Sequence, residues 1–128
     1  MTIGTFAGLS AIGQIAVTVK NVARAVAFYR DILGIPLLFQ APPGLAFFDA
    51  GGVRLMLGLP ERSEFAPPGS ILYFRVDDIA AAYAGLSERG VEFVDAPHLI
   101  ARMPDHELWM AFLRDSEGNM LALMEERR

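Results

Sequence analysis

The sequence has no cysteine, which excludes disulfides, thiolate metal ligands and cysteine nucleophiles. It has no apolar run of the roughly 18 to 20 residues that a membrane-spanning helix needs, and no basic region of the kind that precedes a secretory signal. Basic residues cluster only in the terminal pair Arg127-Arg128, and the formal net charge is -4. We therefore expect a cytoplasmic protein that binds neither nucleic acid nor membranes.

Several common catalytic motifs are also absent. The sequence contains no Walker loop, no GxGxxG after a strand, no GxSxG and no HExxH, and we expect no cofactor. With 128 residues, of which 53% are hydrophobic, the chain has the size of one compact domain with a substantial core. We therefore assign residues 1–128 to a single domain.

The first periodic stretch predicts a strand followed by a helix. Apolar residues alternate with polar or small ones from Gln14 to Val19, as in a half-buried strand. From Asn21 to Leu33 apolar residues recur every three or four positions, as on one face of a helix. Asn21 can cap the first turn of this helix, and Gly34 can end it.

The same pattern returns in the second half of the chain. Alternation from Ile71 onward is followed by a helical pattern that starts at Ile79, after a possible cap at Asp78, and ends at Gly90. We infer an internal duplication, with module one at about 12–60, a linker at 60–69 and module two at about 70–126. Each module is expected to contain a strand, a helix and three further strands, which is an α+β fold.

The remaining strands of module two are assigned from shorter patterns. We expect strands at 92–94, 106–113 and 120–124, the last two joined by a turn at 115–119. Residues 97–104 begin and end with proline and are expected to form a long irregular connection.

These motifs resemble those of the vicinal oxygen chelate superfamily, which includes glyoxalases, bleomycin-resistance proteins, epimerases and extradiol dioxygenases. The resemblance rests on Gln14 at the start of the first strand, the helix 25–34 (AVAFYRDILG), the motif 76–79 (VDDI) and the hairpin 112–119 (FLRDSEGN). It implies two βαβββ modules that form a cup-shaped mixed sheet, with the helices outside and a ligand cavity inside. The resemblance is specific for the fold and not for one activity.

The resemblance also implies four positions at which the enzymes of this superfamily bind a divalent metal. Here these positions are Gln14, Met56, Ile71 and Ala122, and only Gln14 can donate an oxygen atom. A shift of the alignment by one residue would turn core leucines into the cavity. We therefore expect no metal of the family type, and the sequence favours a binding protein over an enzyme.

The predicted cavity face is apolar and rich in methionine, with a few polar groups, as in small-molecule sites. Arg54 or Arg75 can hold a carboxylate or phosphate there through paired hydrogen bonds. The alternative is that the same side chains fill a closed cup and the arginine heads reach solvent. The predicted ligand-binding residues are Gln14, Thr18, Arg54, Met56, Ile71, Tyr73, Arg75, Trp109, Met120 and Ala122.

Candidate catalytic groups are few. His106 or Glu107 can act as a base, but neighbours in a strand point to opposite faces, so the two do not form a joint metal site. His98, in the irregular connection, is the other histidine, and the sequence does not decide whether either histidine reaches the cavity.

The leading hypothesis is therefore a glyoxalase-like or bleomycin-resistance-like protein that binds a small organic molecule without a catalytic metal. One alternative is a metal-dependent lyase, epimerase or dioxygenase of the same superfamily. The other is a structural dimer with a filled cup, paired through exposed Phe47, Phe48 or Trp109. A homodimer is expected in each case, because members of the superfamily often pair about a two-fold axis.

Overall fold

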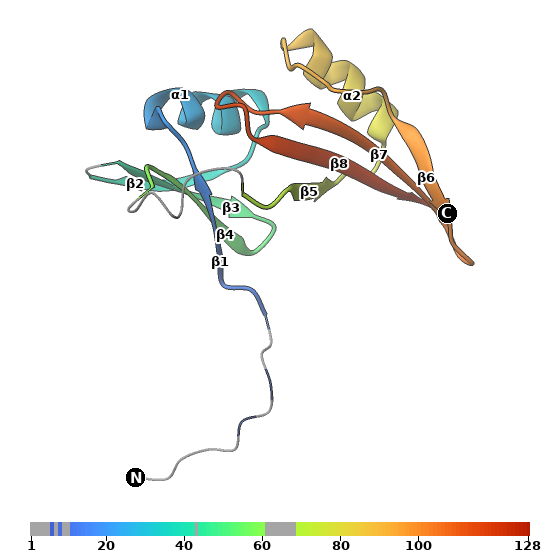
Figure 1. Ribbon diagram of the computed structural model, residues 1–128, viewed down its shortest axis with the longest axis horizontal. Coiled ribbons are helices and arrows are strands. Elements are labelled where there is room, and N and C mark those ends of the chain that lie inside the picture. The colour runs from blue at the N-terminus through green and yellow to red at the C-terminus, as the bar shows by residue number, and fades with distance from the viewer. Residues whose placement is uncertain (1–5, 7, 9–10, 43, 61–68) are drawn as a thin grey trace.

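The computed structural model describes residues 6, 8, 11–42, 44–60 and 69–128. Two separate four-stranded sheets lie next to each other, and the helices lie on one side of them (Figure 1). The predicted pair of βαβββ modules with outer helices is confirmed, but the structure has two separate sheets that do not close into the expected cup. Most of the predicted linker, 61–68, lies outside the described residues.

The two modules repeat the same order of elements. Module one contains β1 (Gln14–Thr18), α1 (Val22–Ala27), the π-helical turn η1 (Phe28–Ile32), β2 (Leu37–Ala41), β3 (Leu45–Ala50) and β4 (Val53–Gly58). Module two contains β5 (Leu72–Arg75), α2 (Ile79–Glu88), β6 (His98–Arg102), β7 (Glu107–Arg114) and β8 (Met120–Arg127). The strand orders are β1-β4-β3-β2 and β5-β8-β7-β6, and in each sheet only the first of these pairs is parallel. This identity of topology supports the inferred duplication.

Both helices begin at the predicted caps. The side chain of Asn21 accepts a hydrogen bond from the backbone N–H of Arg24 at 3.0 Å, and Asp78 Oδ1 accepts one from Ala81 N at 3.1 Å. After Ala27 the first helix continues as η1, where the hydrogen bond runs from Leu33 N to Phe28 O (2.9 Å). No helix in the described part of the chain is long and apolar enough to cross a membrane.

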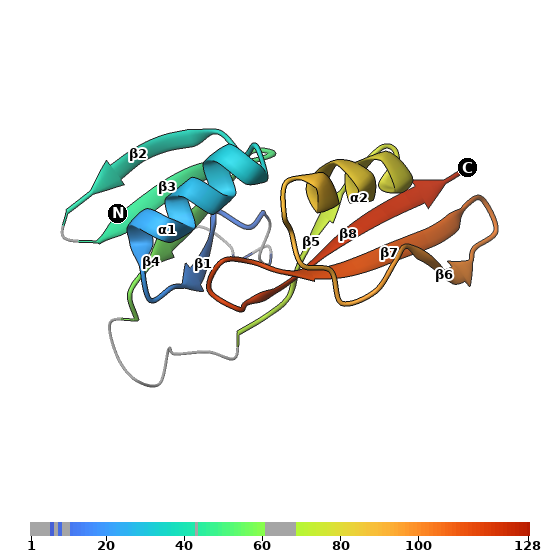
Figure 2. The same ribbon diagram turned by 90° about the horizontal axis from the view of Figure 1, so that it is seen from above.

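The core lies between each sheet and its helix. Leu55 and Leu57 of β4 and Leu121 and Leu123 of β8 are each no more than 5% exposed and face the helices, as the alternation predicts. Figure 2, viewed from the helix side, shows α1 and α2 over their own sheets. The opposite face of each sheet is therefore left for other contacts.

The segment between α2 and β7 corrects the sequence analysis. The strand expected at 92–94 is only an isolated bridge from Phe93 to Leu113, and the strand of this region is β6, inside the stretch 97–104 that was expected to be irregular. The β6–β7 register shifts between Leu99 and Ala101. Pro97 and Pro104 flank this short edge strand, and these proline signals are why the sequence indicated an irregular connection.

The β7–β8 turn connects the two modules. Tyr29 Oη of η1 donates to Asp115 Oδ2 at 2.7 Å, and Asn119 Nδ2 donates to Thr18 O at 3.2 Å. Glu117 accepts from Arg24 Nε at 2.6 Å and from the backbone N–H groups of residues 20 and 21 at 3.0 Å each. Its side chain is only 2% exposed, and the Arg24 hydrogen bond, with these backbone amides, lowers the pKa of Glu117 to about 2. We call this set of contacts the module clasp.

Candidate functional site

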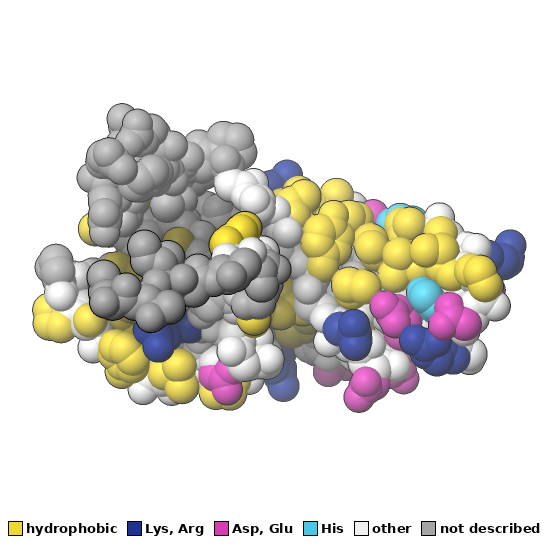
Figure 3. Space-filling model, turned by 90° about the horizontal axis from the view of Figure 1, so that it is seen from below, with side chains coloured by type: hydrophobic (Ala, Val, Ile, Leu, Met, Phe, Trp, Pro, Cys, Tyr) yellow, Lys and Arg dark blue, Asp and Glu magenta, His cyan; other side chains and the backbone are white. Residues whose placement is uncertain are grey.

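The candidate site is the sheet face opposite the helices. Figure 3 shows hydrophobic side chains gathered on this face, most continuously over module two, with charged side chains beside them. In module one, β1 pairs with β4 so that Gln14 opposes Arg54 and Ala16 opposes Met56. Gln14 Nε2 lies 3.8 Å from Met56 Sδ, so the structure brings these two predicted residues into contact.

Aromatic side chains that were not among the predicted ligand-binding residues lie on the candidate face of module one. Phe47 opposes Met56 across the β3–β4 pair, and the ring of Phe39 stacks on Phe47 with 4.6 Å between centroids. The guanidinium of Arg54 lies 5.8 Å from the centre of the Phe47 ring. The adjacent Phe47 and Phe48 conceal the alternation, because Phe48 faces the core on the other side of the strand.

The predicted residues of module two also lie together. Ala122 opposes Tyr73 in β5 and Phe112 in β7, and the Tyr73 and Phe112 rings meet edge to face at 6.0 Å. Arg75 opposes Met124 on the same face. Ile71 directly precedes β5 and is 39% exposed. Phe112 was missed, although it shares its register with Ala122.

The residues at the four metal positions do not fit a divalent cation. Gln14 offers one amide oxygen, whereas Met56, Ile71 and Ala122 offer a thioether, a branched alkyl group and a methyl group. Hard and borderline cations require several oxygen or imidazole ligands. Among the described residues, no group of three or more His, Asp or Glu side chains is arranged to hold a metal ion elsewhere.

Trp109 and Glu107 lie on the helix face and not on the candidate face. Trp109 packs against the core, and its Nε1 donates to Glu107 Oε1 at 3.1 Å. The hydrogen bond from Trp109, and then the one from Arg102, lower the pKa of Glu107. Arg127 covers the Trp109 ring at 4.5 Å. This placement separates both residues from the other predicted site residues.

The same finding corrects the surface suggested for a structural dimer. Phe48 is 0% exposed, Phe47 is 9% exposed and Trp109 lies partly buried under Arg127, so the three side chains do not form an exposed surface on this chain.

The histidines lie in the outer part of module two. His106 directly precedes β7, its side chain is 15% exposed, and its Nδ1 lies 2.7 Å from Asp105 Oδ1. Hydrogen bonds from Arg128 and from His106 lower the pKa of Asp105 to about 2. His98 opposes Met110 at the start of β6, and its Nδ1 lies 3.0 Å from Ala96 O. Neither histidine contacts the residues at the metal positions through a hydrogen bond in the described structure.

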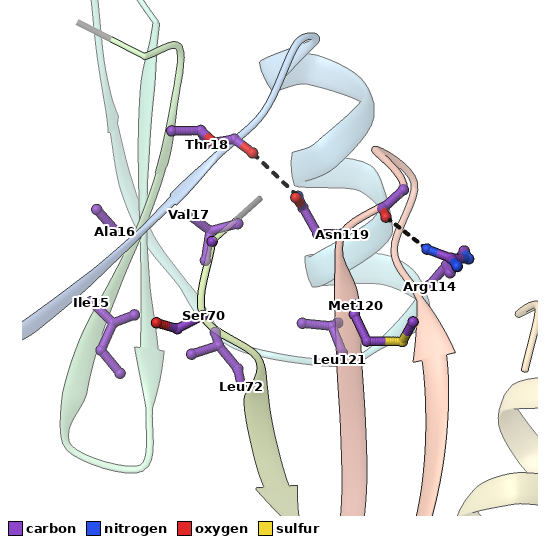
Figure 4. A pocket seen from close by; sticks show the side chains of 12 residues that line it. Ile15, Ala16, Val17, Thr18, Ser70, Leu72, Arg114, Asn119, Met120 and Leu121 are labelled. Carbon is purple, nitrogen blue, oxygen red and sulfur yellow. Dashed lines mark hydrogen bonds between the residues drawn. The ribbon is translucent and has the colours of Figure 1, made fainter. Parts of the chain in front are cut away.

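A hollow of about 460 Å³ lies where β1 meets the start of β5 and the β7–β8 turn (Figure 4). Of the predicted ligand-binding residues, only Thr18 and Met120 line it. Arg114, whose Nη1 donates to Gly118 O at 3.2 Å, and Asn119 add polar groups. We call this hollow the seam pocket; its lining is Ile15, Ala16, Val17, Thr18, Gly69, Ser70, Leu72, Arg114, Gly118, Asn119, Met120 and Leu121.

The seam pocket is formed by residues of both modules, so the sequence pattern of either module alone does not predict it. Ser70, Arg114 and Asn119 reach it only because the clasp holds the β7–β8 turn of module two beside β1 of module one. The only signal in the sequence was the turn motif at 115–119, which indicates a hairpin and not a contact between modules.

Two βαβββ modules with outer helices and open inner sheet faces define a protein of the vicinal oxygen chelate class. The model of the Glyoxalase/Bleomycin resistance protein/Dioxygenase superfamily matches residues 11–123, and the chain belongs to this superfamily. The predicted resemblance is thus confirmed. The family match shows the fold and the lineage, and it leaves the activity to be argued from the site.

Individual relatives agree with this assignment. The chain is 33% identical over 116 residues to metallothiol transferase FosB of Staphylococcus epidermidis. This alignment covers 88% of this chain and 65% of FosB. A superfamily member from Sphaerobacter thermophilus has 27% identity and a TM-score of 0.76, with 92% of this chain and 98% of that chain covered. Lactoylglutathione lyase from Agrobacterium tumefaciens has the same fold, with 24% identity, a TM-score of 0.73, and 91% and 94% of the two chains covered.

Proposed function

We propose that this chain binds a small organic molecule in the seam pocket and on the adjoining sheet faces, without the metal typical of the family. The observation that supports this most directly is the chemistry of the four metal positions, which provide one amide and three apolar side chains. A superfamily scaffold with this composition lacks the groups that hold a Lewis acid. It keeps an apolar surface, and that surface is suited to binding.

The size and lining of the seam pocket suit such a ligand. Small-molecule sites usually measure about 300 to 1,000 Å³ and combine apolar walls with a few polar groups. The seam pocket, at about 460 Å³, has aliphatic walls with Thr18, Ser70, Arg114 and Asn119 as its polar groups. Met120 adds a side chain that adapts to different ligand shapes.

We also propose that the protein is a homodimer. Phe39, Ile71 and Tyr73 on the inner sheet faces are 50%, 39% and 46% exposed. Exposed apolar surfaces of this kind are typical of interfaces, and a second copy would cover them. The molar mass in solution, measured by light scattering, tests this part of the proposal, and a monomer at all concentrations contradicts it.

Metal analysis and ligand screening test the proposed function together. Protein purified without chelator is expected to contain no stoichiometric divalent metal, and a metabolite screen by thermal shift is expected to yield stabilising ligands. A ligand at about 100 times its Kd adds about 2.7 kcal/mol to the free energy of unfolding, a readily measured shift. Stoichiometric nickel, zinc, manganese or iron overturns the proposal in favour of a metal-dependent enzyme.

Two matched variants locate the site. Ala16 is exposed on β1 and lines the seam pocket, so Ala16→Trp fills the pocket and is expected to abolish the ligand-induced shift. Ala23 is exposed on α1, away from the pocket, so Ala23→Trp is expected to keep the shift. Equal ligand stabilisation of both variants, or no stabilising ligand at all, contradicts binding in the seam pocket.

A further inference from the structure

A second hollow, of about 440 Å³, lies on the helix side of the module boundary. Figure 2 shows this side of the molecule, where the end of η1 and the end of α2 approach each other. The hollow is separate from the seam pocket, with only Leu121 common to both linings. We call it the helix-side groove; its apolar walls include Leu33, Ile35, Phe74, Val76, Leu86 and Leu123.

The groove exists because α2 presents small side chains to it. Ala82 and Gly85 line the groove one helical turn apart, and a Cβ atom added to Gly85 would meet no heavy atom within 4 Å. The duplication shows what is missing. When the caps Asn21 and Asp78 are aligned, Gly85 corresponds to Phe28, whose ring is 8% exposed in the core of module one. Module two therefore has a hydrogen atom where module one has a buried aromatic ring.

The side chain of Arg89 supplies the polar group of the groove. Arg89 follows α2, and its Nη1 donates to Ile32 O at 2.7 Å, which links the ends of the two helices. A guanidinium has five N–H donors, so this bond leaves others for a ligand. Within the described part of the chain, Arg89 has no carboxylate at ion-pair distance.

We propose that the helix-side groove is a second binding site, for a monocarboxylate with an apolar body of roughly ten carbon atoms. The apolar body lies against α2 at Ala82 and Gly85, where it occupies the space that Phe28 fills in module one. The carboxylate pairs with Arg89, whose planar donors match its two oxygens. A neutral or cationic ligand of the same size lacks this partner.

Decanoate and decanol are suitable probes, because they share the alkyl chain and differ in the head group. By calorimetry, wild-type protein is expected to bind decanoate about tenfold more tightly than decanol, the effect of one charge-assisted hydrogen-bonded pair. Arg89→Gln is expected to remove this preference while decanol affinity stays unchanged. Equal affinities of wild-type protein for the two probes, or an undiminished preference in Arg89→Gln, overturn the proposal.

Variants at Gly85 test the location. Gly85→Phe, which restores the residue of module one, is expected to abolish binding of both probes, whereas Gly85→Ala keeps it. Ala16→Trp in the seam pocket is expected to leave decanoate binding unchanged. If Ala16→Trp abolishes decanoate binding, the probe occupies the seam pocket and the inference is wrong, while the proposed function stands. If Gly85→Phe does not fold, Gly85→Leu replaces it, and undiminished binding to either variant refutes the site.

Discussion

Replacing Glu117 with glutamine is expected to destabilise the protein by about 2 kcal/mol at neutral pH, because the carboxylate is the centre of the module clasp. Glu117 Oε1 accepts from two backbone N–H groups and from Arg24 Nη2, each at 3.0 Å, and Oε2 accepts from Arg24 Nε at 2.6 Å. A glutamine retains one acceptor oxygen. Its amide NH₂ group would face a donor where the carboxylate has its second oxygen.

The expected loss of stability in Glu117→Gln follows from the lowered pKa of Glu117. A fall from 4.5 in the unfolded chain to about 2 in the folded protein corresponds to about 3 kcal/mol of stabilisation of the folded state. The Arg24 side chain is 55% exposed, and solvent screening reduces this to about 2 kcal/mol. Because the folded-state pKa lies below the unfolded value, the stabilisation is complete above pH 4.5 and is lost as the pH falls toward 2.

Urea unfolding of wild-type and Glu117→Gln protein at several pH values is the assay. The difference in the free energy of unfolding between the two proteins is expected to be about 40% smaller at about pH 3.5 than at neutral pH. Asp31→Asn is the control, because it removes a charge from an ion pair with Arg30 in which both side chains are about half exposed, and such pairs contribute little. A Glu117→Gln protein as stable as Asp31→Asn, or a difference that does not change with pH, refutes the reasoning.

Two further predictions concern the other clasp contact and α2. Tyr29→Phe removes the buried hydrogen bond to Asp115 and is expected to lower the free energy of unfolding, measured in urea, by about 1 to 2 kcal/mol. Burial and then the Asp115 charge raise the pKa of Tyr29, so its phenolate should form only when the wild-type protein unfolds in alkali. Gly85→Ala, in open space within α2, is expected to stabilise by about 0.5 to 1 kcal/mol, whereas Gly90→Ala, at a φ of 86°, destabilises by a similar amount. Equal urea midpoints for the two glycine variants would contradict this.

Features determined by neighbouring residues were predictable from the sequence. The caps Asn21 and Asp78 and the alternation around Met56 each depend on side chains a few positions apart, and the structure confirms them. The same alternation placed Gln14 and Met56 on one face, where they are in contact. The family resemblance then added the placement of the helices on the outer side of the two modules, which short patterns do not contain.

Features that depend on pairing with a distant strand were not predictable. The segment 107–113 is apolar on both faces, so the position of Trp109 on the helix face emerges only from the register of β7 with β8. Strand β6 is interrupted by a bulge after Leu99, and its pairing with β7 shows a strand that the local pattern does not. Phe47 and Phe112 were likewise assigned to the candidate face only from the register of their strands, in which they oppose Met56 and Ala122.

The largest difference between the repeats is at the module boundary. When Leu55 in β4 is aligned with Leu121 in β8, Glu117 of the module-two turn corresponds to Gly51 in the module-one turn. Both Gly51 and its neighbour Gly52 are exposed. Only one of the two turns therefore has the carboxylate that connects the modules, and the duplicated fold is joined by one clasp and not by two.

The helices of the two modules also differ at the positions that contact the module-two turn. Arg24 and Tyr29, which receive the module-two turn, correspond in α2 to Ala81 and Leu86, and both of these line the helix-side groove. One repeat thus has the long polar and aromatic side chains that connect the modules, and the other has the smaller side chains that leave space. The clasp joins the modules on one side of the boundary, and on the other side, among the described residues, α2 contributes only the Arg89 hydrogen bond to Ile32 O. A hollow of about 440 Å³ beside a fixed boundary keeps its shape, and a preformed shape is what a binding site requires.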